Sequence, residues 1–443
     1  MLKRFFTLLI VTILTLSYIF YRQYSVYYYN TKQDYIYNFN KATIKNITLK
    51  DNSFIINQSD KTAFLEVDIN STLFGKVILP SIEIKSDKKS VKSYFELSAT
   101  GKRYINISSF LDKNSTTITL KPNFLTFKKD IKVITYKNPN LKDKKILIIA
   151  PHPDDAEIAS FGLYSTFNKN SFIVTITAGD EGENNYKNIY NDDLKNSYLE
   201  KAKLRILNSS FTPLIGGVKL SNTINLCYFD ATLKKMYQHK SKNIHSIFTK
   251  QNSTKLYRSF SPAPLLKELN TTKNSWNSLV SDLTYLIKKI SPDIIVTPHP
   301  KLDAHPDHIY TTVAVFDALK KSDKKDIKLF LYTNHNLKSE VYPFGKAHST
   351  MDLPPYFKKL NFNSIYSFNI SPLKQKEKIL ALESMNDLRP STQWQSFFGN
   401  IKMALRVLKH KILGNDESYF RRAVRENEVF FIYTQPSLKH IFE

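Results

Sequence analysis

Apolar and polar residues follow one pattern before residue 140 and a different one after it. Between residues 43 and 137, apolar residues alternate with polar ones in short runs, at 62–69, 92–98, 103–108 and 117–120. Alternation with a period of two is typical of half-buried strands, and clusters of Asn, Asp, Lys and Ser separate these runs. We therefore predict an all-β, sandwich-like domain over residues 40–138.

After residue 140, continuous apolar runs alternate with stretches of helical period. The apolar runs predict strands at 145–150, 172–177, 224–229, 293–297 and 327–332. The stretches between them predict helices at 155–168, 191–207, 277–290 and 307–321. Strands that are apolar throughout are buried on both faces. Residues 140–443 are thus predicted to form an α/β domain, with a Rossmann-like, mostly parallel sheet and helices on both faces.

Three segments of this second half have weaker patterns. Residues 231–275 show no clear period and are interpreted as an insertion or as loops near the site. Residues 373–426 are predicted to be helical, and residues 429–433 to form a last strand.

An apolar segment at the N-terminus, residues 5–21, follows Lys3 and Arg4 and holds no charge until Arg22. Its length is at the short end of what spans a bilayer core. We interpret residues 1–30 as a membrane anchor; a cleaved signal peptide is the alternative, although no small-residue cleavage site follows. The flanking charges favour a cytoplasmic N-terminus. The prediction is a single-pass membrane protein whose folded domains lie outside the cytoplasm, in the periplasm or at the cell surface.

The chain carries 64 Lys and Arg against 39 Asp and Glu, a formal charge of +25. This excess attracts anionic partners such as phospholipid headgroups or acidic glycans. The lysines are scattered and form no basic arm, so no nucleic-acid partner is predicted, and no protein partner is indicated. Cys227 is the only cysteine, which excludes an intrachain disulfide and a cysteine-based zinc cluster. It lies in an apolar run and is expected to be a buried structural thiol.

Two short motifs place metal-binding residue types directly after predicted strands. Their side chains are His152, Asp154 and Asp155 after the strand at 145–150, and His305, Asp307 and His308 after the strand at 293–297. Ligands of open α/β sheets bind at the carboxyl ends of the strands, so both motifs are expected at one edge. Imidazole and carboxylate are zinc ligands, and a catalytic zinc site uses three of them. Each motif alone could be a simple turn; together they predict a metal site.

At these residues the chain resembles the PIG-L/LmbE family of zinc-dependent N-acetylsugar deacetylases. Residues 150–158 resemble the family's first signature, residues 304–308 resemble its distal signature, and residues 177–182 are similar to its second strand-end segment. The resemblance extends from about residue 144 to residue 335.

The resemblance implies a metal and a base. His152, Asp155 and His308 would bind Zn²⁺, with another divalent metal as an alternative. Asp154 would deprotonate the zinc-bound water, which would then attack the acetamide carbonyl.

The remaining roles concern the leaving group and the substrate. By the same resemblance, His305 would be the general acid that protonates the departing amine, and Asp307 would orient it. Asp230 would contact substrate hydroxyls. His335 follows the strand at 327–332 and is a further candidate for substrate binding.

The chain departs from the family's pattern around the substrate. Residues 159–163 replace a small, glycine-rich stretch, Lys195 and Tyr198 stand for the usual arginine and glutamate, and Asp303 stands where some members carry a tyrosine. The substrate therefore stays open. We predict a membrane-anchored hydrolase that removes an N-acetyl group from a sugar of an envelope glycan or glycolipid. The alternatives are an amidase acting on a small N-acylated metabolite, and a non-catalytic glycan-binding or assembly protein. The aromatic residues of the β-rich domain are expected to fill its core rather than bind glycan.

Overall fold

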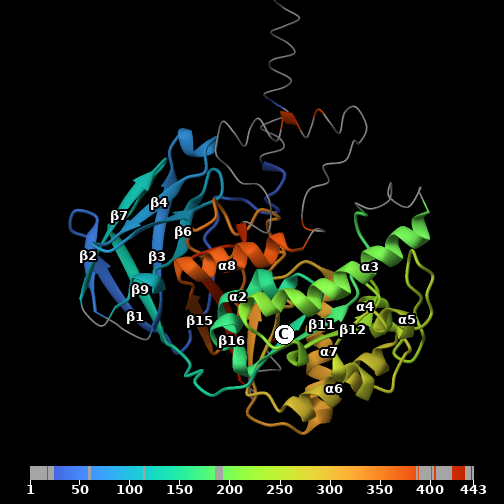
Figure 1. The fold of residues 1–443 in the computed structure, drawn as a ribbon. Helices are drawn as coiled ribbons and strands as arrows, with labels where there is room; N and C mark the ends of the chain where they lie inside the picture. Colours follow the sequence, from blue (N-terminus) through green and yellow to red (C-terminus); the bar gives the residue numbers. More distant parts are fainter. Residues whose placement is uncertain are drawn as a thin grey trace, which may run out of the picture.

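The fold is described from a computed structural model of the whole chain (Figure 1). It describes residues 24–57, 61–112, 115–184, 193–385 and 422–434, with isolated positions at 17, 388, 401, 404–405 and 441. The chain has a mixed α/β fold preceded by a region made of strands, as the sequence indicated.

The N-terminal region consists of two antiparallel sheets. One has the order β1-β9-β3-β6, with β8 also pairing with β3, and the other has the order β2-β7-β4-β5. Their bounds are β1 (Thr43–Thr48), β2 (Ser53–Ile56), β3 (Lys61–Ser71), β4 (Ser81–Lys85), β5 (Ser90–Tyr94), β6 (Thr100–Asn106), β7 (Thr116–Asn123), β8 (Leu125–Phe127) and β9 (Asp130–Lys137). Apolar side chains of both sheets form one core, to which Leu65, Ile84 and Leu120 belong. The region is therefore a β-sandwich.

The second half of the chain forms one sheet with the strand order β12-β11-β10-β13-β14-β16-β15. The strands are β10 (Ile146–Ala150), β11 (Ser171–Thr177), β12 (Thr223–Tyr228), β13 (Ile294–Pro298), β14 (Lys328–Tyr332), β15 (Ser364–Asn369) and β16 (Asn427–Tyr433). The strands from β10 to β14 pair in parallel, whereas β16 runs antiparallel to both of its neighbours. The mostly parallel sheet expected from the continuous apolar runs is present.

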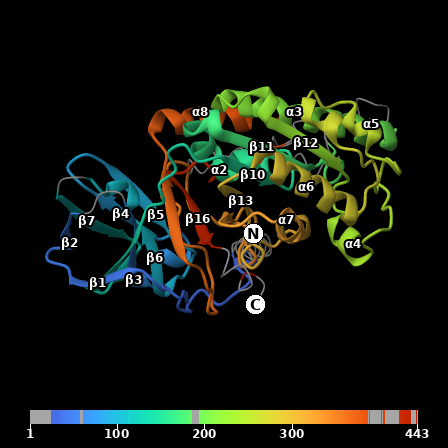
Figure 2. The ribbon, with the colours of Figure 1, turned by 90° about the horizontal axis from the view of Figure 1, so that it is seen from below.

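Helices cover both faces of this sheet (Figure 2). They are α2 (Asp155–Thr166), α3 (Leu194–Phe211), α4 (Leu233–Gln238), α5 (Lys255–Arg258), α6 (Trp276–Ile290), α7 (Pro306–Ser322) and α8 (Pro372–Glu383). Strand β10 shows why its sequence is apolar throughout. Its residues Ile146 and Ile148 belong to the core beneath α2, and the intervening Leu147 belongs to the core beneath α6 and α7. Both faces of the strand thus need apolar side chains.

The sandwich packs with the outer face of one sheet against the α/β domain. Tyr104 of β6 and Tyr136 of β9 belong to the same apolar core as the α/β strands. The ring of Tyr37 lies 5.5 Å from the ring of Tyr104 and 6.1 Å from that of Phe431 in β16. Many aromatic residues of this region therefore fill the contact between the two halves, rather than only the sandwich core as the sequence suggested. The division into units 40–138 and 140–443 stays a prediction.

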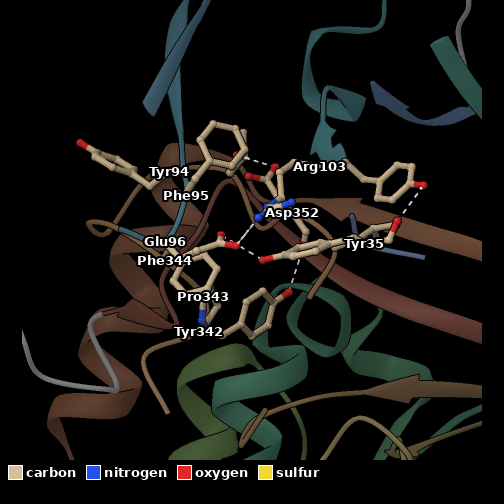
Figure 3. Close-up of a pocket in the computed structure, with 12 residues that line it drawn as sticks. Tyr35, Tyr94, Phe95, Glu96, Arg103, Tyr342, Pro343, Phe344 and Asp352 are labelled. Carbon is tan, nitrogen blue, oxygen red and sulfur yellow. Dashed lines mark hydrogen bonds and ion pairs between the residues drawn. The ribbon is translucent and has the colours of Figure 1, made fainter. Parts of the chain in front are cut away.

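A small pocket at this contact contains a buried ion pair (Figure 3). The Arg103 guanidinium donates to Glu96 Oε1 at 2.6 Å, and its carbon lies 4.1 Å from the centre of the Tyr35 ring. The Tyr35 hydroxyl donates to the other carboxylate oxygen, Glu96 Oε2, at 3.0 Å. Both charged side chains are at most 1% exposed. Their charges are compensated by each other and by hydrogen bonds, as buried charges must be.

The membrane prediction has to be corrected. Within the described part of the chain, no helix is long and apolar enough to cross a membrane. A spanning helix needs about 20 apolar residues, so the single-pass location, and with it the placement outside the cytoplasm, is not supported. The apolar segment at 5–21 that prompted it lies outside the described residues, apart from Ser17.

Other differences from the sequence-based expectations are local. Residues 231–275, expected to be loops, contain α4 and α5 and pack over the end of the sheet. Strand β15 was not predicted. Most of the expected helical stretch at 373–426 lies outside the described residues, beyond α8. Cys227 is buried, as expected.

The buried ion pair yields a stability prediction. We expect Arg103→Met to lower the free energy of unfolding by about 3–5 kcal/mol, because the Glu96 charge is then left buried without its partner. Urea denaturation followed by circular dichroism measures this change. The matched control is Lys88→Ala, which removes an exposed ion pair with Asp112 and should barely move the midpoint. A wild-type midpoint for Arg103→Met would contradict the prediction.

Candidate metal centre

The candidate site lies where the order of the parallel strands reverses. Strand β10 comes first in the sheet, β11 and β12 follow on one side of it, and β13 and β14 follow on the other. At such a reversal the helices after the two central strands lie on opposite faces of the sheet, which leaves a crevice at the carboxyl ends of the strands, where open α/β sheets bind ligands. The first motif follows β10 directly, and the second begins α7 after β13. The structure brings both motifs to this crevice, as the strand pattern predicted.

Three ligand atoms form a nearly equilateral triangle in the crevice. His152 Nδ1 lies 3.2 Å from Asp155 Oδ2 and 3.2 Å from His308 Nε2. His308 Nε2 lies 3.1 Å from Asp155 Oδ2. All three side chains are at least nine-tenths buried, and the ring of the half-buried His305 lies 4.7 Å from the His152 ring.

This triangle fits a divalent metal ion. Two atoms bound at about 2.05 Å to the same tetrahedral zinc lie roughly 3.3 Å apart, close to the separations seen here. Nitrogen and carboxylate oxygen are the donors that zinc takes. Three groups of possible ligands include residues of the triangle, namely His152 with His305 and His308, Asp155 with His308 and His335, and His152 with Asp230 and Asp307. The last group meets His152 at Nε2, on the far side of the imidazole from the triangle.

The electrostatics of the triangle also favour a cation. Burial lowers the pKa of His308, but the carboxylates of Asp155 and Asp303 outweigh this effect and raise it to about 10. Burial raises the pKa of Asp155, whereas His308 and His152 together shift it well below its usual range. Without a metal, protons on the imidazoles thus balance the buried negative charge. A metal ion would displace those protons, because its ligands bind in their deprotonated forms.

Asp154 precedes the ligand candidate Asp155 and lies beside Arg205. It is the residue before α2 and is only partly buried. Its carboxylate Oδ2 lies 3.4 Å from a terminal nitrogen of Arg205, on α3. Gly179, at the end of β11, makes room for this arginine: its φ is +66°, and a Cβ there would lie 2.2 Å from Arg205 Nε. Both facts require glycine at this position.

His305 is the N-cap of α7, and its ring Nδ1 accepts a hydrogen bond from the backbone N–H of Asp307 at 3.2 Å. This contact leaves the ring hydrogen on Nε2. Burial, and then the charges of His152 and His308, lower the pKa of His305 to about 3. The Asp307 carboxylate turns elsewhere and accepts from the N–H groups of Ala231 and Leu233. The hydrogen bond between Asp307 and His305 is thus made by the backbone of Asp307.

The expected substrate residues also reach the crevice. Asp230 Oδ1 lies 3.0 Å from His152 Nε2, on the side of the imidazole away from the triangle. Its backbone N–H donates to the buried Asp180, which is also held by Ser246 and Tyr257 from the insertion at 231–275. The ring of His335 lies 5.0 Å from the ring of His308.

Arg205, Asp303 and Asn334 are residues of the site whose place the sequence did not reveal. Lys195, expected in the place of a family arginine, is exposed, and Arg205 is the arginine that reaches Asp154. The helical spacing of Tyr198, Lys201 and Arg205 puts them on one face of α3, and this periodicity could have identified the arginine. Asn334 carries no such signal, because it meets Asp155 from the loop after β14. Asp303 precedes His308 by five residues, and its contact with the imidazole depends on the fold of the loop before α7.

The comparison with known protein families agrees with the family that the two motifs indicated. Residues 147–319 match the model of the PIG-L family, described as GlcNAc-PI de-N-acetylase. This match includes both histidine–aspartate motifs. It confirms the resemblance inferred from the sequence and the enzyme class that the resemblance implied, an N-deacetylase. No curated protein sequence matches the chain significantly.

Solved structures show distant likenesses. An N,N'-diacetylchitobiose deacetylase from Pyrococcus horikoshii is 20% identical, with 66% of this chain and 85% of that chain covered and a TM-score of 0.36. A deacetylase of the teicoplanin biosynthetic pathway is 17% identical, with 66% and 98% covered and a TM-score of 0.33. A 4-carboxy-2-hydroxymuconate hydratase from Pseudomonas putida is 10% identical, with 66% and 95% covered and a TM-score of 0.34. Likenesses this distant do not identify a substrate.

The geometry of the triangle predicts metal uptake. We expect metal-free protein to bind one equivalent of Zn²⁺ per chain, and His308→Ala to lose at least 100-fold in affinity, because one of three protein ligands is removed. Isothermal titration calorimetry measures both quantities. The control is His348→Ala, since the His348 ring bonds Gln375 and lies outside the triangle. Equal affinities of wild type and His308→Ala would contradict this assignment.

Proposed function

Residues 147–319 belong to the PIG-L family of N-deacetylases, and from this premise we propose that the protein is a metal-dependent hydrolase acting on an N-acetylated sugar of a glycan or glycolipid. The observation that carries the proposal is the triangle of His152, Asp155 and His308, with Asp154 and His305 beside it. The reaction breaks the amide C–N bond. The hydroxyl of water joins the acetyl carbon, and a proton joins the nitrogen. The products are acetate and a free amino sugar.

We propose that the ion bound by His152, Asp155 and His308 is Zn²⁺. When bound, it supplies a Lewis acid that acidifies a water molecule and polarises the acetamide carbonyl. The three side chains are deeply buried, so they hold their positions without competing water. The pairing of two neutral imidazoles with one carboxylate leaves the centre with a net positive charge once a divalent ion is present, which suits an electrophilic role.

Asp154 is the proposed general base. It neighbours Asp155 in the chain and, unlike the three side chains of the triangle, is only partly buried. Its carboxylate Oδ2 lies 3.4 Å from the Arg205 guanidinium. A carboxylate can accept the proton of the attacking water, and the same group, once protonated, can return it to the leaving nitrogen.

His305 is proposed to act through the hydrogen on Nε2. The ring as it stands is neutral, since Nδ1 accepts from the backbone of Asp307. A neutral ring donates a hydrogen bond, whereas full proton transfer, the role drawn from the resemblance, needs a second proton on Nδ1. Both the lowered pKa and the backbone contact oppose that second proton. A donated hydrogen bond would stabilise the charge that develops on the acetamide oxygen or nitrogen.

Asp230 and His335 are the proposed contacts to the sugar. The contacts described for the Asp230 side chain fall on Oδ1, which meets His152 and the N–H of Ala231. Oδ2 is the oxygen that we propose to accept from a sugar hydroxyl. His335 is exposed beside the centre and can reach a substrate there.

Acetate release tests the function. We expect the zinc-loaded protein to release acetate from an N-acetylated oligosaccharide such as N,N'-diacetylchitobiose, and Asp154→Asn to lower kcat by about 10²–10⁴-fold, because the amide cannot accept the proton. An enzymatic acetate assay measures the rate. Asp112→Asn, on the distant sandwich, is the matched control. Zinc-loaded wild type without acetate release from any N-acetylated glycan would contradict the proposal.

Two substitutions at one position separate the two possible roles of His305. The Gln side chain keeps an N–H donor near the place of Nε2 but cannot carry a proton as an acid. If His305 acts by hydrogen bonding, His305→Gln should retain at least tenfold more kcat than His305→Ala, since a lost oxyanion donor typically costs 10²–10³-fold. Equal rates for the two variants would instead point to proton transfer.

A further inference from the structure

The far side of the ligand His308 is occupied by a buried carboxylate. Asp303 Oδ2 lies 3.1 Å from His308 Nδ1, and neither side chain has measurable exposure. A carboxylate on Nδ1 keeps the hydrogen on that nitrogen, which leaves the lone pair of Nε2 for a metal. Nε2 is the His308 atom that belongs to the ligand triangle.

The ligand Asp155 has its own partner on the far side. The Asn334 side chain donates from Nδ2 to Asp155 Oδ1 at 2.7 Å, and it is buried. This bond engages the carboxylate oxygen that does not belong to the triangle. Together with the backbone N–H of His152, which donates to Oδ2 at 3.0 Å, it fixes the rotation of the carboxylate.

The two partners are joined to each other. Asp303 Oδ2 accepts from the backbone N–H of Asn334 at 3.0 Å and from that of His335 at 3.2 Å, and Oδ1 accepts from the N–H of His305 at 3.1 Å. The loop after β13 and the loop after β14 are thereby tied together. With the 3.1 Å contacts that His308 makes with Asp303 and Asp155, these bonds close a ring of contacts that runs from Asp303 through His308 and Asp155 to Asn334 and back to Asp303.

We propose that Asp303 and Asn334 are positioning residues that preset His308 and Asp155 for the metal, and we refer to this pair as the metal brace. The inference rests on the proposed metal site but not on the proposed substrate. Outer partners of metal ligands typically contribute 10–100-fold to metal affinity. The brace gives Asp303, a departure from the family pattern, a role at the metal rather than at the substrate.

Zinc affinity tests the metal brace directly. Metal-free wild type, Asp303→Asn and Asn334→Ala are titrated with Zn²⁺ against a chromophoric chelator. We expect each variant to raise the Kd by 10–100-fold. Asp303→Asn removes the charge facing His308. It also places an amide NH₂, which cannot accept a hydrogen bond, among the backbone N–H groups of His305, Asn334 and His335 and the ring nitrogen of His308. Asn334→Ala removes only the donor to Asp155 and keeps the backbone bond to Asp303.

The control removes a buried carboxylate elsewhere. Asp352 is buried and accepts from the hydroxyls of Ser93 and Thr350 and from the N–H of Asn106. Asp352→Asn should lower the thermal midpoint of the metal-free protein while leaving the zinc Kd within threefold of wild type. Thermal midpoints of all metal-free variants separate loss of affinity from loss of fold; if Asp303→Asn does not fold, Asn334→Ala decides the outcome.

The outcomes are distinct. Weakened zinc binding by each folded brace variant with an unchanged Asp352→Asn supports the brace. Zinc Kd values within threefold of wild type for either folded brace variant overturn it, as does equal weakening by Asp352→Asn. Failure of wild type to bind zinc would overturn the proposed metal site and the brace together. Zinc binding without acetate release would count against the proposed function alone.

Discussion

The parallel pairing of β10 with β13 is the contact on which the site depends. Three pairs hold these strands in register, from Ile146 opposite Ile294 to Ile148 opposite Val296. Because the strands are neighbours and run in the same direction, their carboxyl ends meet, and the residues that follow them converge. His152 and His308 are 156 positions apart in the chain, yet their ring nitrogens are 3.2 Å apart. The apolar faces of β10, packed against helices on both sides, keep this edge in place.

Burial makes the site both demanding and well ordered. A buried carboxylate or imidazole needs a partner for each polar atom, because water is excluded. In this structure, further polar side chains lie against the outer atoms of the three side chains of the triangle. Asp230 lies at the outer nitrogen of His152, and Asp303 and Asn334 engage His308 and Asp155. Each ligand thus has one atom facing the triangle and another engaged behind it. The contacts that compensate the buried polar atoms therefore also orient the ligand side chains.

The sandwich is joined to the α/β domain near the segment that follows β14. Asp352 of that segment accepts from Ser93 and from the backbone of Asn106, both on the sandwich. Arg425, just before β16, donates to the carbonyl groups of Pro343 and Phe344. These contacts fasten residues 343–352 to the sandwich and to the residue before β16. The aromatic residues of the sandwich fill the surface that makes this contact, which explains why they are so abundant there.

The sequence by itself determined the α/β fold with its all-β region, the positions of most strands and helices, and the identity of both motifs. These properties are local: the alternation of apolar residues records which faces of an element are buried, and a motif directly after a strand must lie at the end of that strand. The sequence also led to a wrong conclusion about the membrane. The apolar run at 5–21 suggested a spanning helix, but no helix among the described residues is long and apolar enough to cross a membrane.

Only the tertiary structure decided which residues meet the motifs from other elements. Arg205 reaches Asp154 from α3, and Asn334 reaches Asp155 from the loop after β14. No spacing along the chain encodes these two contacts, because they depend on how the helices and loops pack around the edge of the sheet. Asp303 lies only five residues before His308, and the fold of the loop before α7 decides that its carboxylate faces the imidazole. The sequence therefore identified the candidate ligands, and the packing of separate elements decided what lies behind them.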